Sequence, residues 1–379
     1  MASPPIYLDH HSTTPCDPRV VEKMLPYFTA TFGNPAAITH VHGRKASTAI
    51  EEARIVVGSF LRCRPTEIFF TAGATESNNT ILSALPAGSH VITTAIEHKS
   101  VLVPLARAER RGVTVTRLTP DREGFVRADQ VSEAIVDTTA LVSVMWANGE
   151  IGTVEPIREI AAICRDRGIL FHSDATQAVG KIEVDLSESL CDFISFSAHK
   201  FYGPKGVGGL FIREGKRVEP LFAGGGQEKG IRSGTVNVPG VVGMAEALEL
   251  RRAEMAEEAT RLTGLRNHLW DALTKSVSDV RVNGPRQSRL PGNLSVSFEG
   301  VDADSLMLAM RRFSLSSGSA CSSGDREPSY VLRAIGLDME AAVSTIRFGL
   351  GKQNVSQDVE LLLNDLVSTV PRLRELVVS

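Results

Sequence analysis

Short apolar segments alternate with amphipathic segments from Glu67 to Arg213, and this alternation limits the possible folds more than any other feature of the sequence. The apolar segments are hydrophobic at successive positions, which is typical of strands covered by helices on both faces. Strands that are joined through helices run parallel. We therefore predict an α/β fold with a mostly parallel, doubly wound sheet. Its strands are expected at Ile68–Thr71, His90–Ile96, Val113–Leu118, Ala140–Trp146, Ile169–Ser173, Asp192–Phe196 and Gly209–Arg213.

Helices are expected before and between these strands, where apolar residues recur at helical spacing. The predicted helices are Pro18–Thr29, Arg44–Leu61, Thr75–Leu85, Ser100–Arg111, Gln130–Val136 and Ile157–Arg167.

The sequence changes character after Gly240. One long, charge-rich helix is predicted at Val241–Ser276, and a smaller α+β unit follows, with strands at Asn293–Phe298 and Thr345–Leu350. A chain of 379 residues is longer than one typical domain. We expect a large domain at residues 15–250 and a small domain at residues 251–379, with residues 1–14 as an arm that belongs to the small domain.

The composition is that of an ordinary globular protein, with 42% hydrophobic and 22% charged residues. A net charge of −3 gives no sign of a nucleic-acid or membrane surface. No apolar run reaches the roughly 18 residues of a membrane helix, and no signal peptide is visible. Five cysteines without a Cys-x-x-Cys pair argue against disulfides and metal thiolate sites. We expect a cytoplasmic protein that binds no metal.

Polar residues follow the predicted strand at Asp192–Phe196, where Ser197, His199 and Lys200 precede a glycine-rich run. A lysine at the mouth of a buried strand is costly unless its amine is neutralised, paired or covalently used. A desolvated lysine with a lowered pKa suits Schiff-base chemistry with pyridoxal phosphate. The alternative is an ordinary turn with one solvated lysine.

Three further strand ends carry polar side chains. The segment Thr71–Glu76 joins a strand to a helix, whose free N–H groups and Thr75 hydroxyl could bind phosphate, although Thr75 could also simply cap the helix. A P-loop pattern is absent, so a nucleoside triphosphate is not expected. Asp174 could pair with a pyridine nitrogen and Gln177 with a ring hydroxyl, or Asp174 could be a capping residue. His98 could transfer protons, although a lone histidine is more often structural.

Two features mark the small domain. Cys321 lies in the small-residue loop Ser316–Gly324, without apolar neighbours to pack against, so its thiol is expected to be exposed and reactive. The alternative is a harmless loop cysteine. Arg347 lies in a predicted strand and suits bidentate capture of a substrate carboxylate.

Taken in order, these motifs resemble the cysteine desulfurases, and specifically their first group, the nitrogenase and iron–sulfur-cluster type of the class-V aminotransferase family. The resemblance covers nearly the whole chain. The matching segments are Tyr7–Asp9, Thr13–Pro15, Gly33–Pro35, Gly73–Ser77, Glu97–Lys99, His172–Lys181, Ser197–Gly206, Arg232–Thr235, Ser316–Cys321 and Pro328–Arg333.

The resemblance implies a homodimeric pyridoxal 5'-phosphate enzyme of fold type I that converts L-cysteine to L-alanine and leaves sulfur as a persulfide on Cys321. It also implies that Lys200 holds the cofactor and that His98 stacks on the ring and moves protons. Asp174 would pair with the ring nitrogen and Gln177 with the ring oxygen. The implied phosphate ligands are Ala74, Thr75, Ser197, His199 and, from the neighbouring subunit, Thr235. The implied substrate ligands are Asn34 and Arg347.

Two departures from the family pattern stand out. The family usually has two asparagines where this chain has Asn148 and Gly149, so Asn148 or a water would replace the missing contact with the cofactor hydroxyl, or that contact is absent. We also expect the protein to lack the longer C-terminal tail that some relatives use to dock an iron–sulfur scaffold. The alternatives are a related lyase or aminotransferase, such as one acting on selenocysteine, and a cofactor-free accessory subunit. The sulfur acceptor, a scaffold or thiolation protein, is not identified by the sequence.

Overall fold

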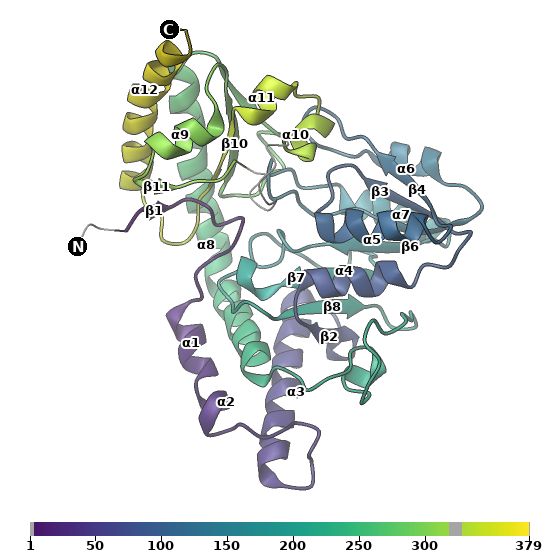
Figure 1. Cartoon of the computed structure of the whole chain (residues 1–379). Coiled ribbons are helices and arrows are strands. Elements are labelled where there is room, and N and C mark those ends of the chain that lie inside the picture. Colours follow the sequence, from purple (N-terminus) through teal and green to yellow (C-terminus); the bar gives the residue numbers. More distant parts are fainter. Residues whose placement is uncertain (1–3, 318–327, 379) are drawn as a thin grey trace.

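A computed structural model describes residues 4–317 and 328–378 of the chain. Its largest sheet has seven strands in the order β2 (Ile68–Thr71), β8 (Gly208–Ile212), β7 (Phe193–Ser197), β6 (Leu170–Asp174), β5 (Thr139–Ser143), β3 (His90–Thr94) and β4 (Thr114–Leu118). All neighbouring pairs from β7 to β4 in this order are parallel. β8 runs antiparallel to both of its neighbours. The predicted α/β fold with a mostly parallel sheet is therefore confirmed (Figure 1).

Successive strand residues enter different cores, which explains the continuous apolar runs. In β2, Ile68 and Phe70 pack on one face of the sheet and Phe69 packs on the other. The face with Phe69 is covered by α4 (Ala74–Ser83) and α5 (Lys99–Glu109). The opposite core is built from α3 (Val41–Leu61), α6 (Ala128–Ala134), α7 (Ile157–Asp166) and the first turns of α8 (Val238–Ser276).

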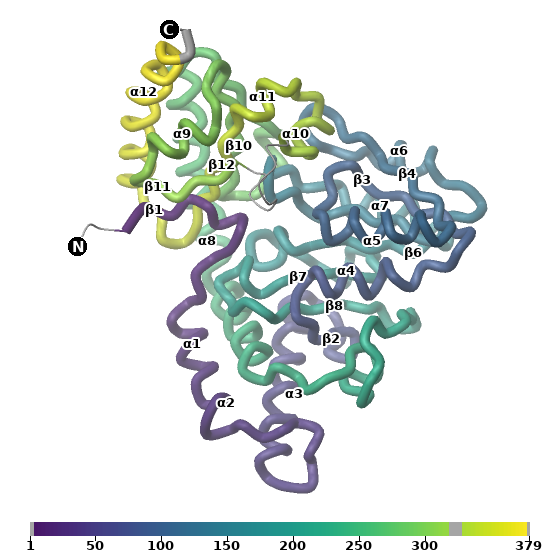
Figure 2. Tube along the Cα trace, in the orientation of Figure 1, coloured from purple at the N-terminus to yellow at the C-terminus, as the bar shows by residue number. Residues whose placement is uncertain are grey.

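A second, antiparallel sheet has the order β12 (Thr345–Gly349), β10 (Asn293–Phe298) and β9 (Val280–Asn283). It shares a core with α9 (Ala303–Ala309), α12 (Ser356–Val378) and the last turns of α8. The N-terminal arm joins this unit, because β1 (Ile6–Tyr7) pairs with β11 (Phe313–Ser314). Figure 2 shows the arm continuing from there to α1 (Pro18–Met24) and α2 (Pro26–Thr29).

The long helix α8 contributes to both cores. Its buried residues from Val238 to Leu248 belong to the core of the large sheet, and those from Leu262 to Leu273 belong to the core of the small sheet. We propose that two domains meet in the intervening turns of α8, near the expected boundary at residues 250–251.

One predicted helix and one predicted strand are shorter in the structure than expected. The helix predicted at Pro18–Thr29 is divided into α1 and α2, because Pro26 lacks the N–H group that would continue the first helix. The strand predicted at Ala140–Trp146 ends at Ser143, and the apolar residues that follow pack in the loop beyond it. Among the described residues, no helix has both the length and the apolar character that crossing a bilayer requires.

A buried ion pair fixes the loop between β8 and α8 to the sheet. Glu228 of this loop accepts hydrogen bonds from the Arg54 guanidinium at 2.8 and 2.9 Å and from the backbone N–H of Phe70 at 2.8 Å. Both side chains are buried. Removing one charge from such a pair leaves the other uncompensated in the protein interior.

Glu228→Gln is therefore expected to lower the free energy of unfolding by about 3 kcal/mol, measured by urea denaturation. Glu214→Gln is the matched control, because Glu214 pairs with Arg64 in an exposed position and should lose less than about 1 kcal/mol. Equal losses in the two variants would contradict the prediction.

Candidate active site

The loops at the carboxyl ends of several strands of the large sheet meet at one edge. Chain segments that follow β2, β3, β6 and β7 carry Ala74, His98, Gln177 and Lys200, respectively. Carboxyl ends of parallel strands lie at the same edge of a sheet, which is where ligands bind in such folds. The structure thus brings together most of the side chains that the sequence singled out.

Lys200 ends the short 3-10 helix η2 (Ala198–Lys200), directly after β7. Its Nζ donates to two backbone carbonyls of the N-terminal arm, that of His11 at 2.9 Å and that of Ser12 at 2.6 Å. The arm therefore holds the amine at the edge of the large sheet. The side chain is half-buried, as expected for an amine that must be desolvated and yet reachable.

An open cleft of about 630 Å³ is lined by Ala74, Thr75, Ser197 and His199, the residue that precedes Lys200. Helix α4 begins there at Ala74, and its N-cap residue is Gly73, whose φ of 149° favours glycine and which has no side chain to cap the helix. The Ala74 N–H donates to Ser197 Oγ at 2.8 Å. Thr75 is exposed at this helix N-terminus and is not its capping residue. A helix start of this kind is able to bind a phosphate.

His199 forms one wall of the cleft, and its Nδ1 lies 3.0 Å from Thr13 Oγ1. Burial and nearby lysine amines lower the pKa of His199 to about 4. The ring is therefore neutral at pH 7, and one of its nitrogens is an N–H donor.

Asp174 and His98 are connected by hydrogen bonds. The buried carboxylate of Asp174 accepts from Thr176 N at 3.0 Å and from Asn78 Nδ2 at 2.8 Å. Asn78 Nδ2 also donates to Ser100 Oγ, which lies 2.7 Å from His98 Nδ1. Because Nδ1 accepts the Ser100 N–H at 3.1 Å, the neutral His98 ring carries its proton on Nε2. The surrounding protein lowers the pKa of His98 by desolvation.

Gln177 lies against Gly149. A Cβ atom at position 149 would stand 2.5 Å from Gln177 Nε2, so a larger residue there would displace the amide. Both ends of the Asn148 amide are used by nearby backbone groups. Its Nδ2 donates to Ile96 O at 3.0 Å, and its Oδ1 accepts the N–H groups of Glu150 and Ile151. The expected role of Asn148 at the cofactor hydroxyl therefore has no support in this geometry: its amide organises its own loop.

Arg347 of β12 reaches the same edge from the small sheet. Its Nη2 donates to Asp9 Oδ1 and to Ser12 Oγ, both at 2.7 Å, and its Nη1 donates to Gly149 O at 3.2 Å. Its buried Nε has no partner among the described residues. The backbone N–H of Arg347 donates to Ser316 O at 2.7 Å, at the start of the predicted cysteine loop. Cys321 itself lies outside the described residues.

Two predicted ligands are not brought to the cleft. Asn34 is exposed between α2 and α3, where its Oδ1 accepts the N–H of Ala36 at 3.0 Å. Thr235 is exposed in the loop before α8. Neither residue lines the open cleft or the small cavity next to Lys200.

Comparisons with known proteins identify the family. The chain matches the family described as aminotransferase class-V over residues 6–362. It is 46% identical to the cysteine desulfurase IscS of Anaeromyxobacter sp. (strain K), over 98% of this chain and 94% of the relative. The chain belongs to the cysteine desulfurases.

Solved structures agree with this assignment of the desulfurase. A NifS-like protein is 36% identical and superimposes with a TM-score of 0.91, covering 97% of this chain and 100% of the other. A structure described as SspA in complex with cysteine is 35% identical, with a TM-score of 0.82 and coverage of 92% and 100%.

The desulfurase depends on pyridoxal phosphate, as its family does, and the residues present fit that cofactor. The start of α4 has no side-chain cap from Gly73 and offers the backbone N–H groups after Ala74 to a phosphate, and the buried Asp174 carboxylate offers an acceptor to a protonated ring nitrogen. The Lys200 amine stands at the same edge of the sheet, as a covalent attachment requires.

The sequence patterns did not assign a role to several residues of this edge. His11 and Ser12 act through backbone carbonyls, which no side-chain pattern reveals. Asn78 and Ser100 link Asp174 to His98 from two helices. Asn78 lies one helical turn after Ala74, so the spacing along the helix that follows β2 was the available signal.

Proposed function

We propose that the desulfurase converts L-cysteine and the Cys321 thiol into L-alanine and a Cys321 persulfide. The substrate C–S bond breaks, a proton replaces the sulfur on the substrate carbon, and an S–S bond forms on the enzyme. Bound pyridoxal phosphate supplies the electron sink for this reaction. The observation that carries the proposal is the convergence of Lys200, Asp174 and the start of α4 at one sheet edge, beside an open cleft.

The positions of the residues support the following roles. Lys200 would hold the cofactor and then move protons, because its amine stands at this edge, where it contacts the N-terminal arm. Asp174 would pair with the ring nitrogen, and the cleft residues Ala74, Thr75, Ser197 and His199 would bind the phosphate. Gln177 donates to the ring oxygen. His98, whose neutral ring carries its proton on Nε2, would stack on the cofactor ring and exchange protons there. Arg347 binds the substrate carboxylate.

The test uses the purified chain with pyridoxal phosphate and L-cysteine. A visible absorption band should form on addition of the cofactor, and alanine and reducible sulfur should appear in equal amounts on addition of L-cysteine. A matched sample without cofactor should form neither product. Absence of the band, or of alanine from L-cysteine, would refute the proposal.

We further propose that the enzyme works as a homodimer. Thr235 is exposed and does not line the cleft of its own chain, so it could contact phosphate only in a second copy. Large apolar side chains are also exposed between α1 and α2, on α2 and in the segment that leads into α3, which is typical of an interaction surface. These are Leu25 (56% exposed), Phe28 (58%), Phe32 (64%) and Ile38 (63%).

Phe32→Glu is expected to weaken the dimer at least tenfold, about 1.4 kcal/mol or more, because dimer formation would bury the new carboxylate. Sedimentation velocity over a range of concentrations measures this change. Val136→Glu is the control, because Val136 is 52% exposed in the loop between α6 and β5. A monomeric wild-type enzyme, or equal effects of the two substitutions, would argue against the proposed surface.

We also propose that the sulfur passes to a protein acceptor, an iron–sulfur scaffold or a thiolation protein, and that the enzyme is cytoplasmic. The four described cysteines form no disulfide, which agrees with a reducing compartment. Incubating the persulfidated enzyme with candidate acceptors and following labelled sulfur would identify the recipient.

A further inference from the structure

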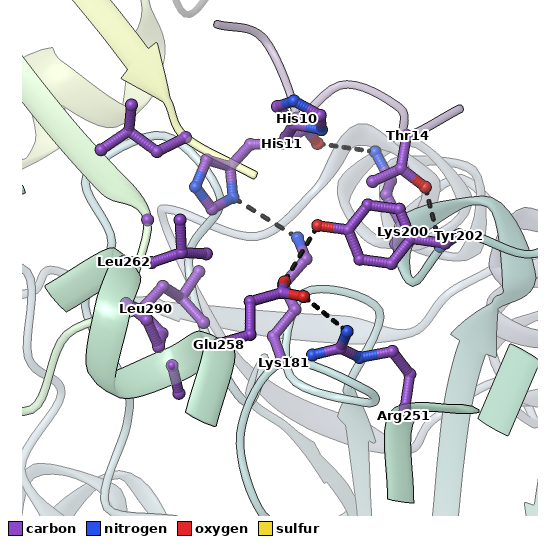
Figure 3. A pocket seen from close by; sticks show the side chains of 14 residues that line it. His10, His11, Thr14, Lys181, Lys200, Tyr202, Arg251, Glu258, Leu262 and Leu290 are labelled. Atoms are coloured by element: carbon purple, nitrogen blue, oxygen red, sulfur yellow. Dashed lines mark hydrogen bonds and ion pairs between the residues drawn. The ribbon is translucent and has the colours of Figure 1, made fainter. Parts of the chain in front are cut away.

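A cavity of about 30 Å³ next to Lys200 contains a second lysine (Figure 3). It lies where the N-terminal arm, the loop after β6 and helix α8 meet, and Lys181 and Lys200 both line it. Its volume suffices for about one or two water molecules but not for a substrate. The roles proposed above leave Lys181 without a task.

Lys181 is hydrogen-bonded to Gln177, the side chain proposed above to donate to the ring oxygen. Its Nζ donates to Gln177 Oε1 at 2.5 Å and lies 3.4 Å from His11 Nδ1. A carboxamide oxygen has no hydrogen to give, so the amine is the donor in either of its protonation states. The oxygen end of the Gln177 amide therefore faces Lys181, its nearest partner, with His11 Nδ1 at 3.3 Å from the same oxygen, and the N–H₂ end must point elsewhere.

The other end of the amide points toward Lys200. Gln177 Nε2 donates to His11 O at 2.9 Å, and the same carbonyl accepts from Lys200 Nζ at 2.9 Å. One backbone oxygen thus places the Gln177 N–H₂ group next to the amine that holds the cofactor. Gly149 leaves the necessary room, because a Cβ atom there would stand 2.5 Å from Nε2.

The charged surroundings of Lys181 are unfavourable for a second cation. Burial and the positive charges of Lys200 and Arg347 lower the pKa of Lys181 well below its usual value. From α8, Glu258 attracts the amine, but its carboxylate already accepts from Arg251 at 2.7 Å and from Tyr202 at 3.0 Å.

The two histidines of the arm do not offset this repulsion. Burial and the nearby Lys181 lower the pKa values of His10 and His11, so both rings are neutral at pH 7. The hydrogen bond from Lys181 Nζ to Gln177, rather than a salt bridge, therefore explains why a lysine is found at this buried position.

We propose that Lys181 is a positioning residue: together with His11 and Gly149, it orients the Gln177 amide so that its N–H faces the ring oxygen of bound pyridoxal phosphate. This inference rests on the proposed function for the contact between Gln177 and the cofactor. A donor at the ring oxygen stabilises the oxygen anion and so favours loss of the proton from the neighbouring Lys200 nitrogen. Lys181 therefore acts on the cofactor through Gln177.

The first test is the pH titration of the visible band in Lys181→Met, which keeps the side-chain length but removes the donor. The variant should still take up pyridoxal phosphate, and the midpoint of the titration should rise by about one pH unit, a tenfold change in proton affinity. Lys275→Met, an exposed lysine at the end of α8, should titrate as the wild type does. An unchanged midpoint in Lys181→Met, with only a loss of thermal stability, overturns the proposal.

A double-mutant cycle then asks whether Lys181 acts through the amide. Gln177→Leu should raise the midpoint by a similar amount, and the double variant should show no more than the shift of Gln177→Leu alone. Additive shifts overturn the proposal. Gly149→Ala displaces the amide while leaving Lys181 intact, so it should also raise the midpoint, and an unchanged midpoint in this variant overturns the proposal even if Lys181→Met fails to fold.

The proposed function and this inference fail separately. Wild-type protein without a visible band or without alanine formation refutes the cofactor site itself, and the inference with it. Wild-type protein with both properties, accompanied by Lys181→Met and Gly149→Ala variants that titrate as the wild type does, refutes only the role of Lys181.

Discussion

Lys200→Met is expected to abolish the visible absorption of bound pyridoxal phosphate and to lower alanine formation from L-cysteine at least about 1,000-fold. Methionine matches the length of lysine but has no amine, so it can neither attach the cofactor nor move protons. It also loses the hydrogen bonds from Nζ to the carbonyls of His11 and Ser12. Absorbance spectra and an alanine assay measure the two effects.

Two comparisons make this result interpretable. Lys275→Met removes an exposed lysine and should change neither the spectrum nor the rate. Lys181 is the other lysine that lines the cavity. A visible band that persists in Lys200→Met and disappears in Lys181→Met would show that the cofactor is attached to Lys181 instead. Persistence of the band and of full activity in both variants would contradict the proposed cofactor site.

The sequence predicted the large sheet well because its signal is local. Each strand of a covered sheet must be apolar over its whole length, and the run that forms β2 shows this directly, with Phe69 in one core and Phe70 in the other. The reversed direction of β8 is not encoded in that pattern, since an apolar strand reads the same in either direction. Only the pairing with its neighbours fixes it.

The candidate site was predictable where a side chain follows a strand end. Lys200 and Asp174 belong to this class, because neighbouring parallel strands end at the same edge. Asn148 shows that a position near the site in sequence does not ensure that the side chain faces it. It is close to the site in sequence, but the hydrogen bonds of its own turn use both ends of its amide.

Long-range contacts account for the rest of the site. His11 contributes a carbonyl from an arm that lies 189 residues away from Lys200 in sequence. The approach of Gln177 to Gly149 depends on how two loops pack. No periodicity or motif specifies either contact, because each arises from the arrangement of whole elements in the folded chain.

Cys321→Ser is expected to lower alanine formation from L-cysteine at least about 1,000-fold and to leave the visible band of the bound cofactor unchanged. Serine keeps the size and polarity of the side chain but cannot form a persulfide. Addition of L-cysteine should still perturb the band, because the residues proposed to bind the substrate are intact. With sulfur-labelled L-cysteine, the wild-type protein should retain label that a thiol reductant removes, whereas the variant should retain none.

The other cysteines are poor candidates for this role, and they provide the controls. Burial raises the pKa of Cys63, Cys164 and Cys191, each to about 12, and it also raises the pKa of Cys16. The thiolate is the nucleophilic form, so each of these four thiols is largely unreactive at pH 7. Cys16→Ser and Cys63→Ser should therefore keep the wild-type rate. Full alanine formation by Cys321→Ser would show that the sulfur leaves without an enzyme persulfide at this position, as in a lyase, and would overturn the proposed mechanism.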